Sequence, residues 1–230
     1  MILSHKYGFI FIKLNKTAGT SVEIAMSKFC GDHDIITPIS PEDEAIRRLL
    51  HHRGPQNYLA PVSDYSIKTC IQSVLRRRMM RRFFNHMSAR DIKERVGDDI
   101  WNSYYKFCVV RNPWERIVSM YYWKHRNETP PPMSAFLESG YPRLLMERGY
   151  DLYTIEGDVV VDNVCRFENL EEEMRLLRRR LKLPSSIDLP RAKSGFRKDR
   201  RHAADILNAT QKEKIRDMFS EEIRLFKYSI

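Results

Sequence analysis

The chain has 230 residues, of which 42% are hydrophobic and 11% aromatic, so it can bury a sizeable core and is not an intrinsically disordered protein. Its 40 Lys and Arg residues against 30 Asp and Glu residues give a formal net charge of +10. This charge attracts anions, but it does not distinguish phosphates, sulfates, acidic glycans, nucleic acids and anionic membranes.

Cysteine usage and the N-terminus bear on the compartment. The four cysteines are far apart and form no C-x-x-C pair, which argues against a disulfide framework or a zinc site and for a reducing compartment. The first residues lack the basic segment, apolar run and cleavage site of a signal peptide, and no stretch approaches the ~18 apolar residues of a membrane span. We expect a cytoplasmic protein without stable membrane insertion; a lumenal form trimmed of its membrane anchor would give the same pattern.

The chain opens with a predicted strand, loop and helix. Residues 8–14 are a nearly continuous apolar run rich in Phe and Ile, which is typical of a buried strand. Residues 15–21 are mostly small or polar and indicate a loop. Apolar residues then recur at helical spacing, followed by a glycine as C-cap: Val22, Ala25, Met26, Phe29 and Gly31.

The next segment gives weaker signals. Residues 32–80 are rich in proline at first, with a short helix predicted over 42–51 and a helical apolar stripe over 67–75. Arginines follow at 76–78 and 81–82. We interpret them as a solvated face, with steering of an acidic acceptor as the alternative.

The middle of the chain is more regular. Ser88 and Gly97 are the predicted start and stop of a helix, and residues 104–110 are the second clear strand. Asn112 and Pro113 then make a strong helix start. The stripe of that helix is expected to be core rather than a platform for adenine: Trp114, Ile117, Val118 and Tyr121. Two cysteines in strand-like runs are expected to be buried: Cys108 and Cys165.

The last part predicts short β segments at 159–161 and 164–167 and a helix that starts at Asn169 and is closed by Pro184. Residues 185–205 are interpreted as a basic loop, and Thr210 with Glu213 as the capping box of a final helix. Alternation of strands and helices predicts an α/β fold over residues 1–230, a single domain with a mostly parallel central sheet flanked by helices and a P-loop-like nucleotide-binding core. Ligands of such sheets lie beyond the carboxyl ends of the strands, here at the first loop and at Arg111.

The first loop has the composition of a phosphate site: Lys16, Thr17, Ala18, Gly19, Thr20 and Ser21. Small residues let backbone N–H groups approach a phosphate, and the helix N-terminus adds partial positive charge. The alternative is an ordinary strand-to-helix turn. The loop is not a Walker A motif, because its lysine precedes its glycine.

A second motif follows the second strand. Arg111 leaves the strand end and can bind a phosphate through two hydrogen bonds. Ser119 lies two turns into the next helix, where local reasoning alone favours a small polar residue on a half-buried face.

Together these motifs resemble a known family. K-T-A-G-T-S after F-I-F-I, followed later by R-N-P-W-E-R-I-V-S, is similar to the sulfotransferases that use 3′-phosphoadenosine 5′-phosphosulfate (PAPS), in particular the branch of carbohydrate sulfotransferases and bacterial members. The resemblance implies that residues 16–21 hold the 5′-phosphosulfate, with Lys16 acting in catalysis, and that Arg111 and Ser119 hold the 3′-phosphate. The product would be 3′-phosphoadenosine 5′-phosphate (PAP), and no metal would be required. The chain departs from the branch by having Lys13, Leu14 and Asn15 where many members have His-Ile-Pro.

Further similarity is weaker. Residues 166–170 resemble the family's F-E-x-L segment, and 193–198, with Arg197 and Lys198, resemble the basic loop that closes over the nucleotide. Residues 32–80 match no segment that we can name and are interpreted as a possible family-variable insertion.

His86 is the candidate general base, because the family places a histidine in a comparable position. A neutral imidazole can take a proton from an alcohol that attacks sulfur in line. Without the resemblance, a helix-start or surface histidine would be the preferred interpretation. The weaker candidates are His51, His52 and His125, and His202 in the basic loop could face the nucleotide.

The expected reaction is therefore sulfuryl transfer from PAPS to a hydroxylated acceptor, a carbohydrate or another molecule, with an acidic glycan among the candidates. A nucleotide-dependent kinase is the same-scaffold alternative, and the absent Walker A pattern argues against it. A nucleic-acid-binding protein would need a reading module that the sequence lacks. The intact motifs argue against an inactive scaffold, and the sequence leaves the oligomeric state open.

Overall fold

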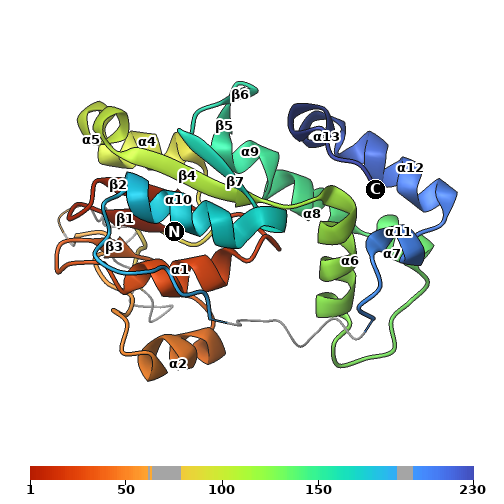
Figure 1. The fold of residues 1–230 in the computed structure, drawn as a ribbon, viewed down its shortest axis with the longest axis horizontal. Coiled ribbons are helices and arrows are strands. Elements are labelled where there is room, and N and C mark those ends of the chain that lie inside the picture. Colours follow the sequence, from red (N-terminus) through yellow and green to blue (C-terminus); the bar gives the residue numbers. More distant parts are fainter. Residues whose placement is uncertain (62, 64–78, 191–198) are drawn as a thin grey trace.

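The computed structural model describes residues 1–61, 63, 79–190 and 199–230. The central sheet of this part of the chain has five strands in the order β3-β1-β2-β4-β7 (Figure 1). The strands are β1 (Ile2–Ser4), β2 (Phe9–Ile12), β3 (Ile35–Ile36), β4 (Tyr105–Val110) and β7 (Asn163–Arg166). β2 pairs with β4 and β4 with β7 in parallel, whereas β1 is antiparallel to β2 and β3. The sheet is mixed, and its parallel half carries the two strand ends singled out above.

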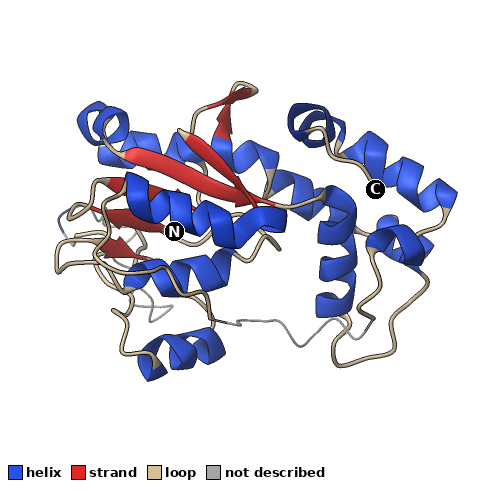
Figure 2. Cartoon of the chain, in the orientation of Figure 1, coloured by secondary structure: helices blue, strands red, loops and turns tan. Residues whose placement is uncertain are grey.

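Helices cover both faces of the sheet (Figure 2). One face packs against α1 (Gly19–Ser27) and α10 (Leu170–Arg180), and the other against α4 (Ala89–Val96), α5 (Asp98–Ser103) and α9 (Tyr150–Tyr153). The expected α/β sheet flanked by helices is confirmed.

The apolar run of β2 is continuous because both of its faces are covered. Successive side chains of a strand point to opposite faces. Phe9 and Phe11 accordingly belong to the core on the α1 side, and Ile10 and Ile12 to the core on the α4 side. The ring of Phe11 stacks on Phe107 of β4 at a centroid distance of 5.1 Å, which ties the two parallel strands together.

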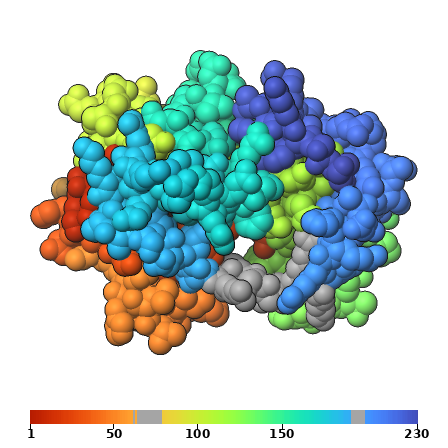
Figure 3. Space-filling view, in the orientation of Figure 1, coloured from red at the N-terminus to blue at the C-terminus, as the bar shows by residue number. Residues whose placement is uncertain are grey.

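A third core holds the helices beyond the carboxyl ends of β4 and β7. These helices are α6 (Pro113–Lys124), α7 (Met133–Leu137), α8 (Gly140–Glu147), α11 (Ala203–Ile206), α12 (Ala209–Met218) and α13 (Ser220–Phe226). Smaller elements are α2 (Pro41–Leu49), β5 (Thr154–Ile155), β6 (Asp158–Val159) and the 3-10 turn η2 (Phe167–Asn169). In the space-filling view the surface is hollowed between α10 and the α6 side of the molecule (Figure 3).

Several predicted helix boundaries are confirmed by their caps. The Asn112 side chain accepts hydrogen bonds from the backbone N–H groups of Trp114 and Glu115, with Pro113 at the first helical position. The Ser88 side chain accepts from the N–H of Asp91, and Gly97, with φ 82°, ends α4. The stripe of α6 is buried in the third core, as expected: Trp114, Ile117, Val118 and Tyr121.

Other expectations need correction. The capping box near the C-terminus is Asn208 with Gln211, not Thr210 with Glu213, and the helix it starts is followed by α13. The strand predicted over 159–161 is the two-residue β6, and the loop predicted over 185–205 ends in α11.

Some predictions concern segments outside the described residues. The helical stripe over 67–75, the arginines at 76–78 and Cys70 lie there. Cys108 and Cys165 are buried free thiols, as expected, and Cys30 is a third.

Candidate functional site

The loop between β2 and α1 has a backbone suited to anions. Lys16 and Ala18 have φ values of 64° and 63°, and Thr17 between them does not have a positive φ. A left-handed conformation at a non-glycine residue costs about 1–3 kcal/mol and persists where the surrounding structure enforces it. Alternating conformations of this kind turn successive N–H groups toward one side, forming a concave anion site. No side chain caps the N-terminus of α1, so its first N–H groups can serve a ligand.

Gly19 is required where α1 begins. A Cβ at this position would lie 2.8 Å from Lys13 Cγ and 3.3 Å from the carbonyl oxygen of Leu14. The loop therefore packs so closely on the end of β2 that a larger residue would displace it.

The loop lines a cleft of about 390 Å³. The residues predicted for the site that line this cleft are Lys16, Ala18, Gly19, Thr20, Ser21, His86, Arg111 and Ser119. Thr17 does not line it, because its side chain is fully buried. Arg197 and Lys198 lie outside the described residues.

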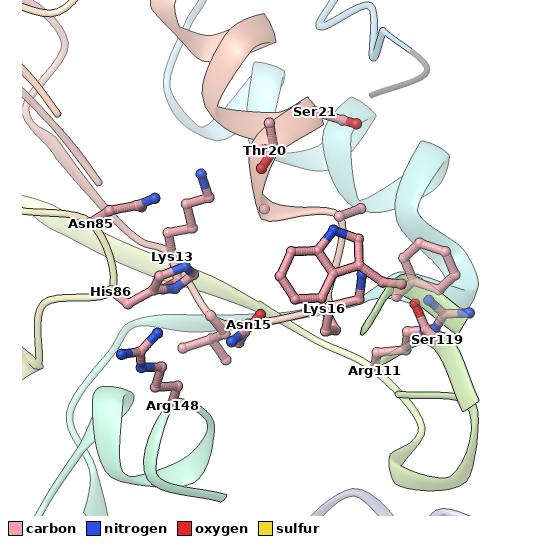
Figure 4. A pocket seen from close by; sticks show the side chains of 15 residues that line it. Lys13, Asn15, Lys16, Thr20, Ser21, Asn85, His86, Arg111, Ser119 and Arg148 are labelled. Carbon is pink, nitrogen blue, oxygen red and sulfur yellow. The ribbon is translucent and has the colours of Figure 1, made fainter. Parts of the chain in front are cut away.

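Arg111 and Ser119 lie at one end of the cleft (Figure 4). The Arg111 guanidinium lies 4.2 Å from the centre of the Phe167 ring, and its Nη2 is 3.5 Å from Glu115 Oε2. These contacts fix the plane of a guanidinium that follows directly after β4. Ser119 is half-buried on α6, which starts just beyond Arg111.

Lys16 contacts an aromatic residue that sequence reasoning missed. Its Nζ lies 5.1 Å from the centre of the Trp123 ring, which also lines the cleft. Trp123 follows Ser119 by four residues on α6, so a helical spacing of four from a predicted site residue could have identified it.

His86 lies at the other end of the cleft, with Lys13, Asn85 and Arg148 (Figure 4). Its Nδ1 is 3.0 Å from the carbonyl oxygen of Lys13. A carbonyl only accepts hydrogen bonds, so Nδ1 carries the proton and Nε2 has the lone pair. Burial, followed by the positive charge of Lys13, lowers the pKa of His86 to about 3. The imidazole is therefore neutral at pH 7 and can accept a proton at Nε2.

The wall behind His86 contains a buried ion pair. Lys13 Nζ is 2.7 Å from Glu23 Oε2, and both side chains are almost fully buried. Burial acts to raise the pKa of Glu23, but the charges of Lys13, the N-terminal ammonium and Arg47 outweigh it and hold the value at about 2. Lys13 thus borders the cleft with an ammonium paired to a carboxylate that it shares with the N-terminal ammonium, 3.1 Å from Glu23 Oε1, and with Arg47.

Comparison with known proteins decides the family. A profile described as the Sulfotransferase family matches residues 1–154, which include the loop, His86, Arg111 and Ser119. The chain belongs to the sulfotransferase family. An uncharacterized protein of Archaeoglobus fulgidus is 31% identical over 108 residues, which cover 45% of this chain and 88% of the archaeal protein. No solved structure matches the chain significantly.

The other histidines of this sulfotransferase have contacts elsewhere. His52 Nδ1 is 2.9 Å from the carbonyl oxygen of Ile24, and His125 Nδ1 is 2.8 Å from Glu128 Oε1. His51 is exposed, and so is His202, whose Nδ1 lies 3.9 Å from Oε1 of Glu115, the carboxylate that contacts Arg111. His86 is therefore the histidine, among those considered as a base, that lines the cleft.

A buried arginine joins the loop of this sulfotransferase to its C-terminal helices. Arg116 of α6 donates through Nε to the carbonyl oxygen of Asn15 at 2.9 Å and through Nη1 to the Glu222 carboxylate of α13 at 3.1 Å. Its Nη2 donates to the carbonyl oxygens of Leu145 and Arg148. Burial raises the pKa of Glu222, which Arg116 opposes.

Within residues 1–61, 63, 79–190 and 199–230, no three His, Cys, Asp or Glu side chains are grouped as a metal site would require. No helix there combines the length and apolarity needed to span a bilayer.

Proposed function

We propose that the protein transfers the sulfuryl group of PAPS to a hydroxyl group of an acceptor, with PAP as the product and His86 as the general base. One observation carries the proposal. A single cleft is lined by a loop with left-handed backbone at Lys16 and Ala18, by Arg111 and Ser119 at one end, and by a neutral histidine at the other. Membership of the sulfotransferase family supports the same reaction.

The donor end of the proposed site consists of three groups. Lys16 and the N–H groups of residues 16–21 would hold the 5′-phosphosulfate, and their positive charge favours the negative charge that develops on the leaving phosphate oxygen. Arg111 and Ser119 would hold the 3′-phosphate and position the donor. PAPS itself supplies the sulfuryl group and the phosphate leaving group. Closure by Arg197 and Lys198 is part of the proposal and lies outside the described residues.

His86 acts on the acceptor. Its Nε2 removes the hydroxyl proton while the Nδ1–H remains hydrogen-bonded to the Lys13 carbonyl oxygen, which holds the ring and stabilises the imidazolium. A pKa of about 3 makes His86 a weak base in the free protein. The negative charges of a bound donor would raise this pKa, so the base strengthens when the donor is present.

The two rival functions make different binding predictions. A kinase would bind ATP with magnesium in preference to PAP. A nucleic-acid-binding protein would bind oligonucleotides with a steep salt dependence, and free nucleotide would not displace them.

Calorimetric titration of the wild type with PAP, and separately with ATP and magnesium, tests the proposal. We expect tight PAP binding and weak ATP binding. Arg111→Ala should weaken PAP binding by about 10–100-fold, since a charge-assisted hydrogen bond contributes about 1.5–3 kcal/mol. The exposed Arg224, which pairs with Glu221, provides the control Arg224→Ala, and its PAP affinity should be unchanged. Folded protein that fails to bind PAP would overturn the proposal.

A further inference from the structure

Arg148 is held in place by its main chain. Its carbonyl oxygen accepts hydrogen bonds from the N–H of Asn15 at 3.1 Å and from Arg116 Nη2 at 3.3 Å, and its own N–H donates to the carbonyl oxygen of Leu144 at 3.0 Å. The residue just after α8 is therefore fixed against the first residue of the loop, while its exposed side chain lines the cleft.

The charge of Arg148 is not neutralised within the described part of the chain, where its guanidinium makes no hydrogen bond or ion pair. The neighbouring carboxylate, Glu147, pairs with Arg143 instead. The other cations of the cleft differ in this respect: Lys13 is paired with Glu23, and Arg111 contacts Glu115. Lys16 lies against the Trp123 ring.

The position of Arg148 relative to the rest of the site indicates what it could bind. It lies at the His86 end of the cleft, away from Arg111 and Ser119 (Figure 4). Its positive charge contributes to the low pKa of His86, after burial and the charges of Lys13 and the N-terminal ammonium, in keeping with their proximity. If the phosphates of the donor occupy the other end, the molecule that approaches His86 is the acceptor.

We infer that Arg148 binds an anionic group of the acceptor, a carboxylate or a sulfate ester close to the hydroxyl that presents its proton to His86. This inference rests on the proposed function and names the substrate class of the same site. A guanidinium donates two parallel hydrogen bonds to a carboxylate or sulfate, so it selects such acceptors over neutral ones. Arg148 is thus a specificity-determining residue, separate from the groups that hold the nucleotide.

The test compares sugars that differ in charge. Methyl β-D-glucuronide, glucose 6-sulfate, the neutral methyl β-D-glucoside and the cationic methyl glucosaminide are titrated by NMR into wild type, Arg148→Gln and Arg148→Glu, with and without saturating PAP. We expect the wild type to bind at least one anionic sugar about tenfold more tightly than the glucoside. Tighter binding of the glucuronide would indicate a carboxylate site, and tighter binding of glucose 6-sulfate a sulfate site. Arg148→Gln should abolish the difference, and Arg148→Glu should favour the glucosaminide. Arg224→Gln, at an exposed arginine that pairs with Glu221 away from the cleft, is the matched control and should retain the preference.

Several results would overturn the inference. One is equal binding of anionic and neutral sugars by the wild type, and another is a preference for anionic sugars that survives in Arg148→Gln. A third is an Arg148→Gln variant that binds PAPS more weakly but binds the sugars as the wild type does, which would assign Arg148 to the sulfuryl group of the donor. PAP affinity separates the inference from the proposed function. It should stay within about twofold in all Arg148 variants, whereas failure of the wild type to bind PAP contradicts the proposed function. The titrations without nucleotide keep the charge preference measurable in that case.

Discussion

Lys13 and His86 are joined by a hydrogen bond from His86 Nδ1 to the carbonyl oxygen of Lys13, 3.0 Å away. The bond links the end of β2 to a residue more than seventy positions later, and it determines which imidazole nitrogen is available in the cleft. The same lysine directs its ammonium to Glu23 on α1. One residue therefore orients the candidate base through its backbone and borders the cleft through its side chain.

Replacement of His86 should separate catalysis from nucleotide binding. We expect His86→Gln to lower the rate of sulfuryl transfer by about 10²–10⁴-fold, the usual contribution of a general base, while PAP affinity stays close to that of the wild type. The measurement is acceptor-dependent PAP release, with an acceptor found by screening the wild type. His125→Gln, which removes a histidine paired with Glu128, is the control and should keep its activity. Full activity in His86→Gln would rule out His86 as the base.

The titration of His86 provides a test that needs no acceptor. The NMR resonances of His86 can be assigned by their loss in His86→Gln. As the pH is lowered, we expect them to remain those of a neutral ring until the pH approaches the pKa of about 3. PAP should raise that pKa, because its negative charges favour the protonated ring. A pKa near the ordinary 6.5 in the free protein would contradict the described environment.

The same shift predicts how stability depends on pH. The folded-state pKa lies below the ordinary value of 6.5, so the unfolded chain takes up this proton first as the pH falls. The His86 contribution to the free energy of unfolding is therefore fully present above about pH 6.5 and decreases as the pH falls toward 3. Urea unfolding at several pH values should show a steeper fall in the free energy of unfolding for the wild type than for His86→Gln, most clearly between about pH 6.5 and 4.5, above the range in which Glu23 titrates.

The Lys13–Glu23 pair should be costly to break from one side. Glu23→Gln leaves Lys13, the N-terminal ammonium and Arg47 without their shared carboxylate, and we expect a loss of about 3–5 kcal/mol in the free energy of unfolding. Lys13→Met combined with Glu23→Gln should recover part of that loss, because it removes one of the three buried cations that share the Glu23 carboxylate; the N-terminal ammonium and Arg47 remain. Urea denaturation of the single and double variants measures the coupling, and additive effects would show that the pair is not coupled.

Gly19 should tolerate no added methyl group. Gly19→Ala places a Cβ 2.8 Å from Lys13 Cγ, and we expect a loss of about 1–3 kcal/mol in stability together with weaker PAP binding, since the loop must shift. Gly140→Ala is the control, because a Cβ there meets no atom within 4 Å. Thermal unfolding and PAP titration of both variants check this, and equal behaviour of the two would contradict the close packing of the loop.

Features with a local cause could be predicted from the sequence. The run from Phe9 to Ile12 is apolar because both faces of its strand are covered, and the Asn112-Pro113 start acts within one turn of its helix. The loop was indicated by its composition and its place after a strand, whereas His86 came from the family resemblance; His86 and all of the loop residues 16–21 except Thr17 line the cleft. The edge strand β3 could not be predicted, because its two residues are too few to show the alternation of buried and exposed side chains.

Features that depend on distant contacts could not be predicted. Glu23 lies on a helix, and nothing in its neighbourhood indicates that it partners Lys13. Arg148 follows a helix that the sequence did not reveal, and only the folded chain brings it beside the loop. The capping error near Thr210 has a local reason: Asn208 with Gln211 and Thr210 with Glu213 offer the same pattern two residues apart, and the former is used.

The hydrogen bonds of Arg116 have a consequence for dividing this chain. The region matched by the family profile ends at residue 154, whereas the carboxylate opposite Arg116 belongs to α13. A fragment cut at residue 154 would keep all of the described residues that are proposed to bind the donor. It would, however, lack Glu222, the carboxylate that faces the Arg116 guanidinium. The loop of the candidate site therefore depends on the last helix, and a shortened or fused version must retain α13 to keep the loop in place.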